Sequence, residues 1–247
     1  MRQLLIITLL VLLALPVGAQ DRTVQNRPYT DLRKLHFGVL VGAHLQDLEL
    51  VNVGPQTVTT EDGGTQTMEI ACDQNSWDPA FQVGVLAELR LNETFQFRVA
   101  PAMYFGSRHI TFKNYSVADE RKSYMEKNQQ LKSAYISCAF DLIAAAPRFN
   151  NHRPYFMIGL NPTMNLMGKD QDYLKLNRSD VFLEAGLGCD FYLPFFKLRP
   201  ELKFMYGLTN SLDTSHPATL RDEAMRPYAT SVSKARSKMI CLTFYFE

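Results

Sequence analysis

The sequence lacks a charge excess, is poor in cysteine and has no long apolar run after its first residues. Its 26 lysines and arginines against 25 aspartates and glutamates leave a formal charge of +1. This balance argues against a nucleic-acid binder, which needs basic side chains to displace counterions. Charged residues at 21% and a mean hydropathy of −0.15 exclude a multi-helix membrane protein, and 46% hydrophobic residues exclude a disordered chain. A membrane β-barrel stays compatible, because only every second residue of its strands faces lipid.

The four cysteines match no metal-binding spacing. Cys72 lies in a polar segment, whereas Cys138, Cys189 and Cys241 lie in strand-like runs. Isolated strand cysteines usually pack as small apolar side chains. A disulfide stays open for an exported chain.

The N-terminus has the pattern of a secretory signal. Arg2 precedes an apolar run at 4–16, and small or short side chains at 17–19 precede Gln20. We therefore expect a signal peptide over 1–19, a periplasmic segment over 20–33 and a membrane domain over 34–247. No later stretch is long and apolar enough for a membrane helix.

Apolar and polar residues then alternate with a period of two in eight segments, which predicts strands. The segments cover residues 36–45, 81–90, 95–104, 134–142, 155–161, 181–191, 198–206 and 239–246. Most are close to the roughly 9–11 residues of a tilted membrane strand. We expect little helix, with a single turn at most in 119–131. The fold class predicted is all-β: an eight-stranded antiparallel transmembrane up-and-down β-barrel.

The connections alternate in length. Short joins are expected at about 91–94, 146–153 and 193–196, and long polar joins at about 47–77, 107–130, 168–179 and 208–233. Periplasmic turns and long extracellular loops alternate in this way in outer-membrane barrels. The pattern predicts that both termini lie in the periplasm.

Aromatic residues gather near the strand ends, as in the girdles of a membrane barrel. The predicted girdle at the short-turn end comprises Phe37, Phe95, Phe97, Phe140, Tyr155, Phe156, Phe191, Tyr192, Phe195, Phe196, Phe244, Tyr245 and Phe246, and that at the long-loop end comprises Trp77, Phe81, Tyr104, Phe105 and Tyr206.

Alternation alone does not tell a lipid-embedded barrel from a soluble exported one, whose apolar face would point inward. Two features favour lipid. The less apolar face is rich in Gly, Ala and Ser, as a narrow interior requires. Its charges are also of both signs and so can neutralise one another. The predicted inward charges are Glu88, Arg90, Arg98, Asp141, Glu184, Asp190, Arg199, Glu201 and Lys203.

No residue pattern predicts a catalytic, cofactor or metal site. The inward charges are interpreted as a paired, packed lumen. His36 and His44 share the inward face but are far apart and lack a third ligand. Ser211, Asp213, Ser215 and His216 crowd one loop, yet they are ordinary loop residues. We therefore expect no enzyme, no cofactor, no nucleic-acid partner and no small-molecule substrate.

Several segments, in matching order over nearly the whole mature chain, resemble the PorT family of Bacteroidetes. They are residues 34–38 (KLHFG), 89–92 (LRLN), 97–101 (FRVAP), 105–108 (FGSR), 150–155 (NNHRPY), 188–194 (GCDFYLP), 196–197 (FK), 200–204 (PELKF) and the ending at 237–247. The resemblance implies an outer-membrane component of the type IX secretion system, which exports proteases, adhesins and gliding proteins. It implies no catalytic residues.

The expected role is that of an accessory barrel in protein secretion, because an eight-stranded lumen is filled by side chains and passes no cargo. Its expected partners are outer-membrane lipid and other secretion proteins. The alternative is a small structural or adhesive barrel of the OmpA/OmpX kind. A third reading, a lipid-modifying enzyme, requires a Ser/His pair fixed at the rim.

Overall fold

The computed structural model describes residues 24–59, 64–116, 124–167 and 172–247; the predicted signal peptide lies outside these ranges. The strands are β1 (Leu35–Asn52), β2 (Pro55–Thr59), β3 (Thr65–Asp73), β4 (Asp78–Arg90), β5 (Phe95–Asn114), β6 (Met125–Ala145), β7 (His152–Asn165), β8 (Ser179–Tyr192), β9 (Lys197–Gly207) and β10 (Val232–Phe246). Short helical turns are η1 (Thr30–Leu32), η2 (His216–Thr219), η3 (Glu223–Met225) and α2 (Arg226–Ala229). Within the described ranges no helix is long and apolar enough to cross a membrane.

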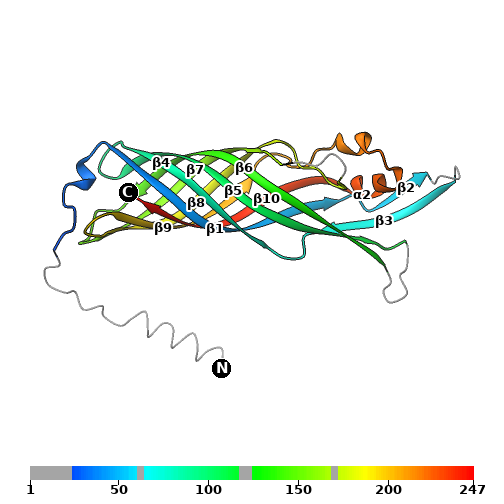
Figure 1. The fold of residues 1–247 in the computed structure, drawn as a ribbon, viewed down its shortest axis with the longest axis horizontal. Helices are drawn as coiled ribbons and strands as arrows, with labels where there is room; N and C mark the ends of the chain where they lie inside the picture. Colours follow the sequence, from blue (N-terminus) through cyan, green and yellow to red (C-terminus); the bar gives the residue numbers. More distant parts are fainter. Residues whose placement is uncertain (1–23, 60–63, 117–123, 168–171) are drawn as a thin grey trace, which may run out of the picture.

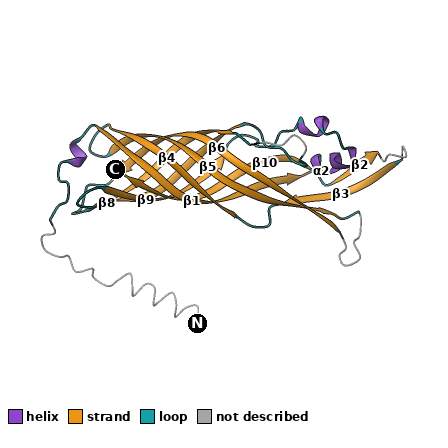
Figure 2. Ribbon diagram, in the orientation of Figure 1, coloured by secondary structure: helices purple, strands orange, loops and turns teal. Residues whose placement is uncertain are grey.

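Eight of these strands form a closed antiparallel ring in the order β1-β4-β5-β6-β7-β8-β9-β10. Pairing between β1 and β10 closes the ring, with a register that runs from Val39 opposite Phe246 to Val51 opposite Lys234. The ring appears as an elongated cylinder of crossing strands (Figures 1 and 2). Joins 91–94, 146–151 and 193–196 are short, as expected. The predicted all-β, eight-stranded barrel is confirmed.

The predicted long loops at 47–77 and 107–130 are wrong in part, because strands continue through them. β5 and β6 stay paired up to Asn114 opposite Met125. The additional hairpin β2–β3 joins the edge of β5, from Ile70 opposite Asn114 to Asp73 opposite Thr111. Of residues 119–131, for which a single helical turn is predicted at most, 125–131 belong to β6, and 119–123 lie outside the described residues. Outside the bilayer neither face of a strand has to be apolar. Apolar and polar residues therefore do not clearly alternate in these strand segments.

The wall of the barrel body is apolar outside and charged inside. Every Asp, Glu, Lys and Arg within 35–45, 79–89, 95–105, 134–144, 154–164, 181–191, 198–206 and 240–246 is buried. Outward neighbours such as Phe156, Ile158 and Leu160 are close to half exposed. This outer surface, here called the apolar belt, is suited to lipid. Of the nine predicted inward charges only Arg90 is misplaced: it is half-exposed at the turn and bonds the Asn92 carbonyl.

Four tyrosines assigned to the girdles lie inside the barrel instead. Tyr104, Tyr155, Tyr192 and Tyr245 are all buried. The hydroxyls of Tyr155 and Tyr245 donate to Glu201, which explains their inward position because a buried phenol needs a polar partner. The exposed aromatics at the short-turn end include Phe37, Phe95, Phe97, Phe140, Phe156, Phe195 and Phe196.

Candidate functional site

The lumen of the barrel body holds a concentration of buried charge that begins at the short-turn end. There the Arg199 guanidinium, fully buried, forms ion pairs with Glu88, with Asp190 at 2.5 Å and with Glu247 at 2.7 Å. Lys197 also pairs with Glu247. Strands β4, β8 and β9 supply all of these groups except Glu247, which directly follows β10, and alternate residues of each strand point inward.

A second cluster, centred on Arg98, fills the next layer. The Arg98 Nε lies 2.9 Å from Asp141 Oδ2, and its Nη2 lies 2.8 Å from Glu201 Oε2. The hydroxyls of Tyr155 and Tyr245 each donate to Glu201 at 2.9 Å. The guanidinium also lies 4.3 Å from the centre of the Tyr245 ring. All five side chains are buried, and the cation is enclosed by two carboxylates and an aromatic ring.

A third pair completes the charged layers. Lys203 Nζ lies 3.2 Å from Glu184 Oε2, and Asn161 Nδ2 donates to the same oxygen at 3.3 Å. Gly159 stands opposite both Asp141 and Glu184 in the strand register. A side chain at this position would collide with Asp141 Oδ1, so glycine is what allows the carboxylate to fit.

An apolar layer continues the filling toward the long loops. Leu40, Leu86, Tyr104, Phe182 and Met205 pack together inside the wall. The lumen is therefore occupied by ion pairs and then by packed apolar groups. The buried charges of this filling are paired with one another, as charges away from water must be.

The long-loop end carries its own hydrophobic cluster, which roofs the barrel. It joins Leu48, Phe112, Leu174, Tyr228 and others from β1, β5 and the loops after β7 and β9. The Gln129 side chain fixes the β7–β8 loop through two 2.9 Å hydrogen bonds, donating to the Leu174 carbonyl and accepting from its amide. Within the described residues, both loops are thus held down as part of the roof.

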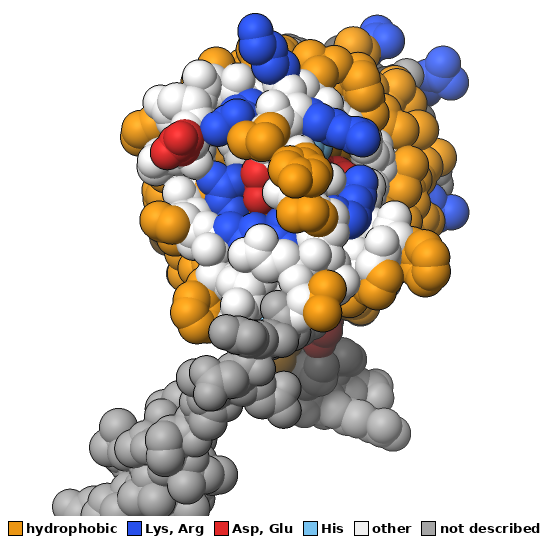
Figure 3. Space-filling model, turned by 90° about the vertical axis from the view of Figure 1, so that its left-hand side faces the viewer, with side chains coloured by type: hydrophobic (Ala, Val, Ile, Leu, Met, Phe, Trp, Pro, Cys, Tyr) orange, Lys and Arg blue, Asp and Glu red, His pale blue; other side chains and the backbone are white. Residues whose placement is uncertain are grey.

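At the short-turn end, residues 24–33 fold across the rim of the barrel as a strap. Arg148 donates to the Asn26 and Arg27 carbonyls, and its guanidinium lies 3.6 Å from the centre of the Tyr192 ring. The Tyr192 hydroxyl donates to Asp31 Oδ1 at 2.7 Å. Figure 3 shows basic side chains surrounding acidic ones at this end of the molecule. The strap brings η1 next to the C-terminal end of β10 (Figure 1).

Replacing Arg148 with alanine is expected to release the strap. Loss of its charge-assisted hydrogen bonds costs about 1.5–3 kcal/mol, so the Asn26 and Thr30 amides should exchange hydrogen roughly tenfold faster or more. Hydrogen–deuterium exchange on the folded protein measures this. Arg33→Ala, which removes an exposed arginine of the same segment, should leave those amides unchanged. Equal exchange in wild type and Arg148→Ala would contradict the strap.

The residues considered for catalysis do not assemble into a site. Ser211 Oγ donates to Asp180 Oδ2 at 2.5 Å, while the His216 ring contacts the Asp172 carbonyl at 2.6 Å. Ser215 Oγ donates to Asp213 Oδ1 at 2.6 Å, and this bond holds the pKa of Asp213 below its usual range. Each group is engaged separately, and neither Ser211 nor Ser215 bonds the His216 ring.

The two inward histidines are also separate. His36 Nδ1 lies 3.6 Å from Glu247 Oε2 at the short-turn end. His44 packs edge-on against Tyr104 with ring centres 5.3 Å apart. Among the described residues, no group of three or more His, Cys, Asp or Glu side chains is placed to hold a metal ion.

All four cysteines are free. Cys72 is buried in the roof, and this burial raises the pKa of its thiol. The sequence leaves a disulfide open, and in the folded chain none of the four cysteines forms one.

The match to one family model agrees with the geometry. Residues 19–213 match the family described as "Outer membrane protein beta-barrel domain". Similar solved structures are OprG from Pseudomonas aeruginosa (TM-score 0.46, 14% identity, covering 86% of this chain and 94% of that one) and Neisserial surface protein A (0.39, 13%, 86% and 98%). Another is Ail of Yersinia pestis, in complex with the heparin analogue sucrose octasulfate (0.36, 10%, 87% and 99%). No curated protein matches the chain.

Proposed function

Because the chain belongs to the outer membrane protein β-barrel domain family, we propose that it is a non-enzymatic accessory barrel of the type IX secretion system. The secretion role is supported by the segments at 97–101, 188–194 and 200–204, which resemble the PorT family. In this role the barrel contacts other secretion proteins and supports the export of proteases and adhesins without carrying them.

The filled lumen is the observation that supports an accessory role over that of a conduit. A translocating chain would have to displace the buried ion pairs of Arg98 and Arg199. Removing one partner of such a pair costs about 3–5 kcal/mol, and several would have to break together. Cargo therefore takes another path.

The orientation we propose follows from the alternation of joins. The strap and the C-terminal end of β10 lie at the end with short turns. We place this end in the periplasm and the roof outside the cell, because outer-membrane barrels have short periplasmic turns. Partner proteins of the secretion system then meet either the strap and turns from within or the roof from outside.

Two experiments test the two halves of this proposal. Deleting the gene in the native host should abolish surface display of secreted proteases and adhesins; normal display would end the secretion hypothesis. The purified barrel in a planar bilayer should show no conductance of the size of a wide porin. A stable open pore would end the closed-lumen hypothesis while leaving a role in secretion.

A small structural or adhesive barrel is the second candidate function. It is favoured by the extension of β5 and β6 to 20 and 21 residues and by the β2–β3 hairpin attached to β5. Such an ordered projection presents a defined surface for ligands. Co-purification with secretion components in mild detergent would favour the first function, and cell adhesion lost in the deletion strain, with secretion intact, would favour the second.

A further inference from the structure

Directly beyond the apolar belt, β10 carries three cations at alternate outward positions: Lys234, Arg236 and Lys238, here called the cationic ladder. Ile240 and Leu242, the next outward residues of the same strand, belong to the belt. The strand therefore changes from apolar to cationic within two residues. In a membrane barrel this change falls at the level where hydrocarbon meets lipid headgroups.

Neighbouring strands engage part of the ladder. Lys238 Nζ lies 2.7 Å from Glu49 Oε2 on β1, and Arg236 Nη1 donates to the Tyr206 hydroxyl on β9 at 2.8 Å. Asp47, opposite Lys238 in the register, is the other nearby acid. The ladder is thus held against the outer wall and not folded into the lumen.

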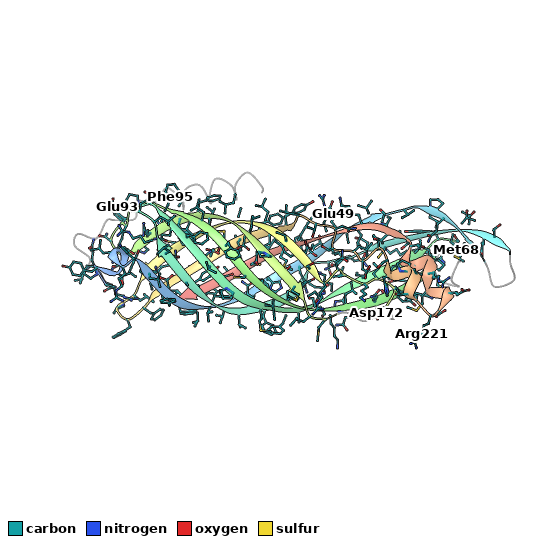
Figure 4. All side chains as sticks on the ribbon, turned by 90° about the horizontal axis from the view of Figure 1, so that it is seen from above. Glu49, Met68, Glu93, Phe95, Asp172 and Arg221 are labelled. Carbon is teal, nitrogen blue, oxygen red and sulfur yellow. The ribbon has the colours of Figure 1, made fainter. Side chains whose placement is uncertain are left out.

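The remaining cationic capacity is at Lys234 and Arg236. The Lys234 ammonium makes no hydrogen bond or ion pair within the described part of the chain, and the Arg236 guanidinium donates only through Nη1, to the Tyr206 hydroxyl. These two residues, with Glu49 and Val51, line a depression of about 130 Å³ on the outer wall. Glu49 is occupied by Lys238, so two cations are left to face the depression. Figure 4 shows Glu49 on the outside of the wall, between the barrel body and the long-loop end marked by Met68 and Arg221.

We propose that the cationic ladder binds the phosphate groups of glycolipids of the lipid A type in the outer leaflet. Basic side chains beside a membrane span attract anionic headgroups, and arginine suits phosphate because its planar donors match the phosphate oxygens. The acyl chains of the same lipid would lie on the belt below, at Ile240 and Leu242 of β10. This inference uses the orientation proposed above, but it holds for a secretion barrel and an adhesive barrel alike.

The test measures retention of lipid A by the detergent-purified mature protein with native mass spectrometry. Wild type should retain bisphosphorylated lipid A after detergent exchange. The amount of lipid A bound to the triple variant Lys234→Gln/Arg236→Gln/Lys238→Gln should be lower by about tenfold or more. Chemically dephosphorylated lipid A should be lost from both. The control Arg33→Gln/Lys34→Gln/Lys132→Gln removes three exposed cations elsewhere and should retain lipid A like wild type.

Folding is checked on each variant by heat-modifiable migration in gels. The single variant Lys234→Gln breaks no contact of the described chain, and it should already retain less lipid A than wild type. If the triple variant does not fold, this single variant is compared with wild type in its place. Equal retention by wild type and both ladder variants would overturn the proposal. So would equal retention of dephosphorylated lipid A, which would show contact through acyl chains alone. Neither outcome depends on whether the barrel serves secretion.

Discussion

Replacing Arg98 with methionine is expected to lower the free energy of unfolding by about 3–5 kcal/mol. The change leaves Asp141 and Glu201 buried without the cation that lies within 2.9 Å of each. The two tyrosine hydroxyls that donate to Glu201 remain, but they are neutral and offset only part of the loss.

Urea titration in lipid vesicles measures this, followed by the fluorescence of Trp77, the only tryptophan. Arg90→Met is the matched control, since Arg90 lies at the rim and bonds a single carbonyl; it should change stability by less than about 0.5 kcal/mol. If Arg98→Met were as stable as Arg90→Met, the ion pairs of the lumen would not be the support of the fold. The triple variant Arg98→Met/Asp141→Asn/Glu201→Gln should recover part of the loss.

A charge placed on the apolar belt is the second large effect. Leu160 projects outward near the middle of β7, opposite Phe140 of β6. Leu160→Arg is expected to destabilise the barrel by about 2–4 kcal/mol, because the guanidinium then lies at the bilayer midplane.

The control for this prediction lies beyond the belt. Gln130 is exposed on β6 toward the long-loop end, where arginine should cost roughly 0–1 kcal/mol. The same urea titration in vesicles compares the two variants. Equal effects at positions 160 and 130 would mean that the belt does not face hydrocarbon.

The sequence predicted the barrel body well, because a period of two records which face each residue takes. Glu184, Arg199 and Lys203 follow this parity and are buried as expected. Tyr155 and Tyr245 also have the inward parity, so their place in the lumen was readable from alternation. Their aromatic character predicts a place in the girdle instead, and this prediction is wrong for both. Lys197 and Glu247, at strand ends where alternation stops, gave no such signal.

Regions outside the bilayer were predicted poorly for a physical reason. The β2–β3 hairpin and the N-terminal part of β6 are solvated on at least one face. Polar residues such as Thr67 and Asn128 therefore do not indicate whether the segment is a strand or a loop. The strap depends on contacts between residues more than 120 positions apart, such as Asn26 with Asn151. Contacts at that separation leave no local pattern.

The seam between β1 and β10 has a consequence for how the barrel is made. It joins Val39 to Phe246, so the cylinder stays open until the last strand has been delivered. Until then both marginal strands expose unpaired backbone groups, which are templates for aggregation. Contacts so distant along the chain also form slowly, since a long loop must be ordered first. An open cylinder of this kind therefore has two free edges, one on β1 and one on β10, and only their pairing at the seam removes both.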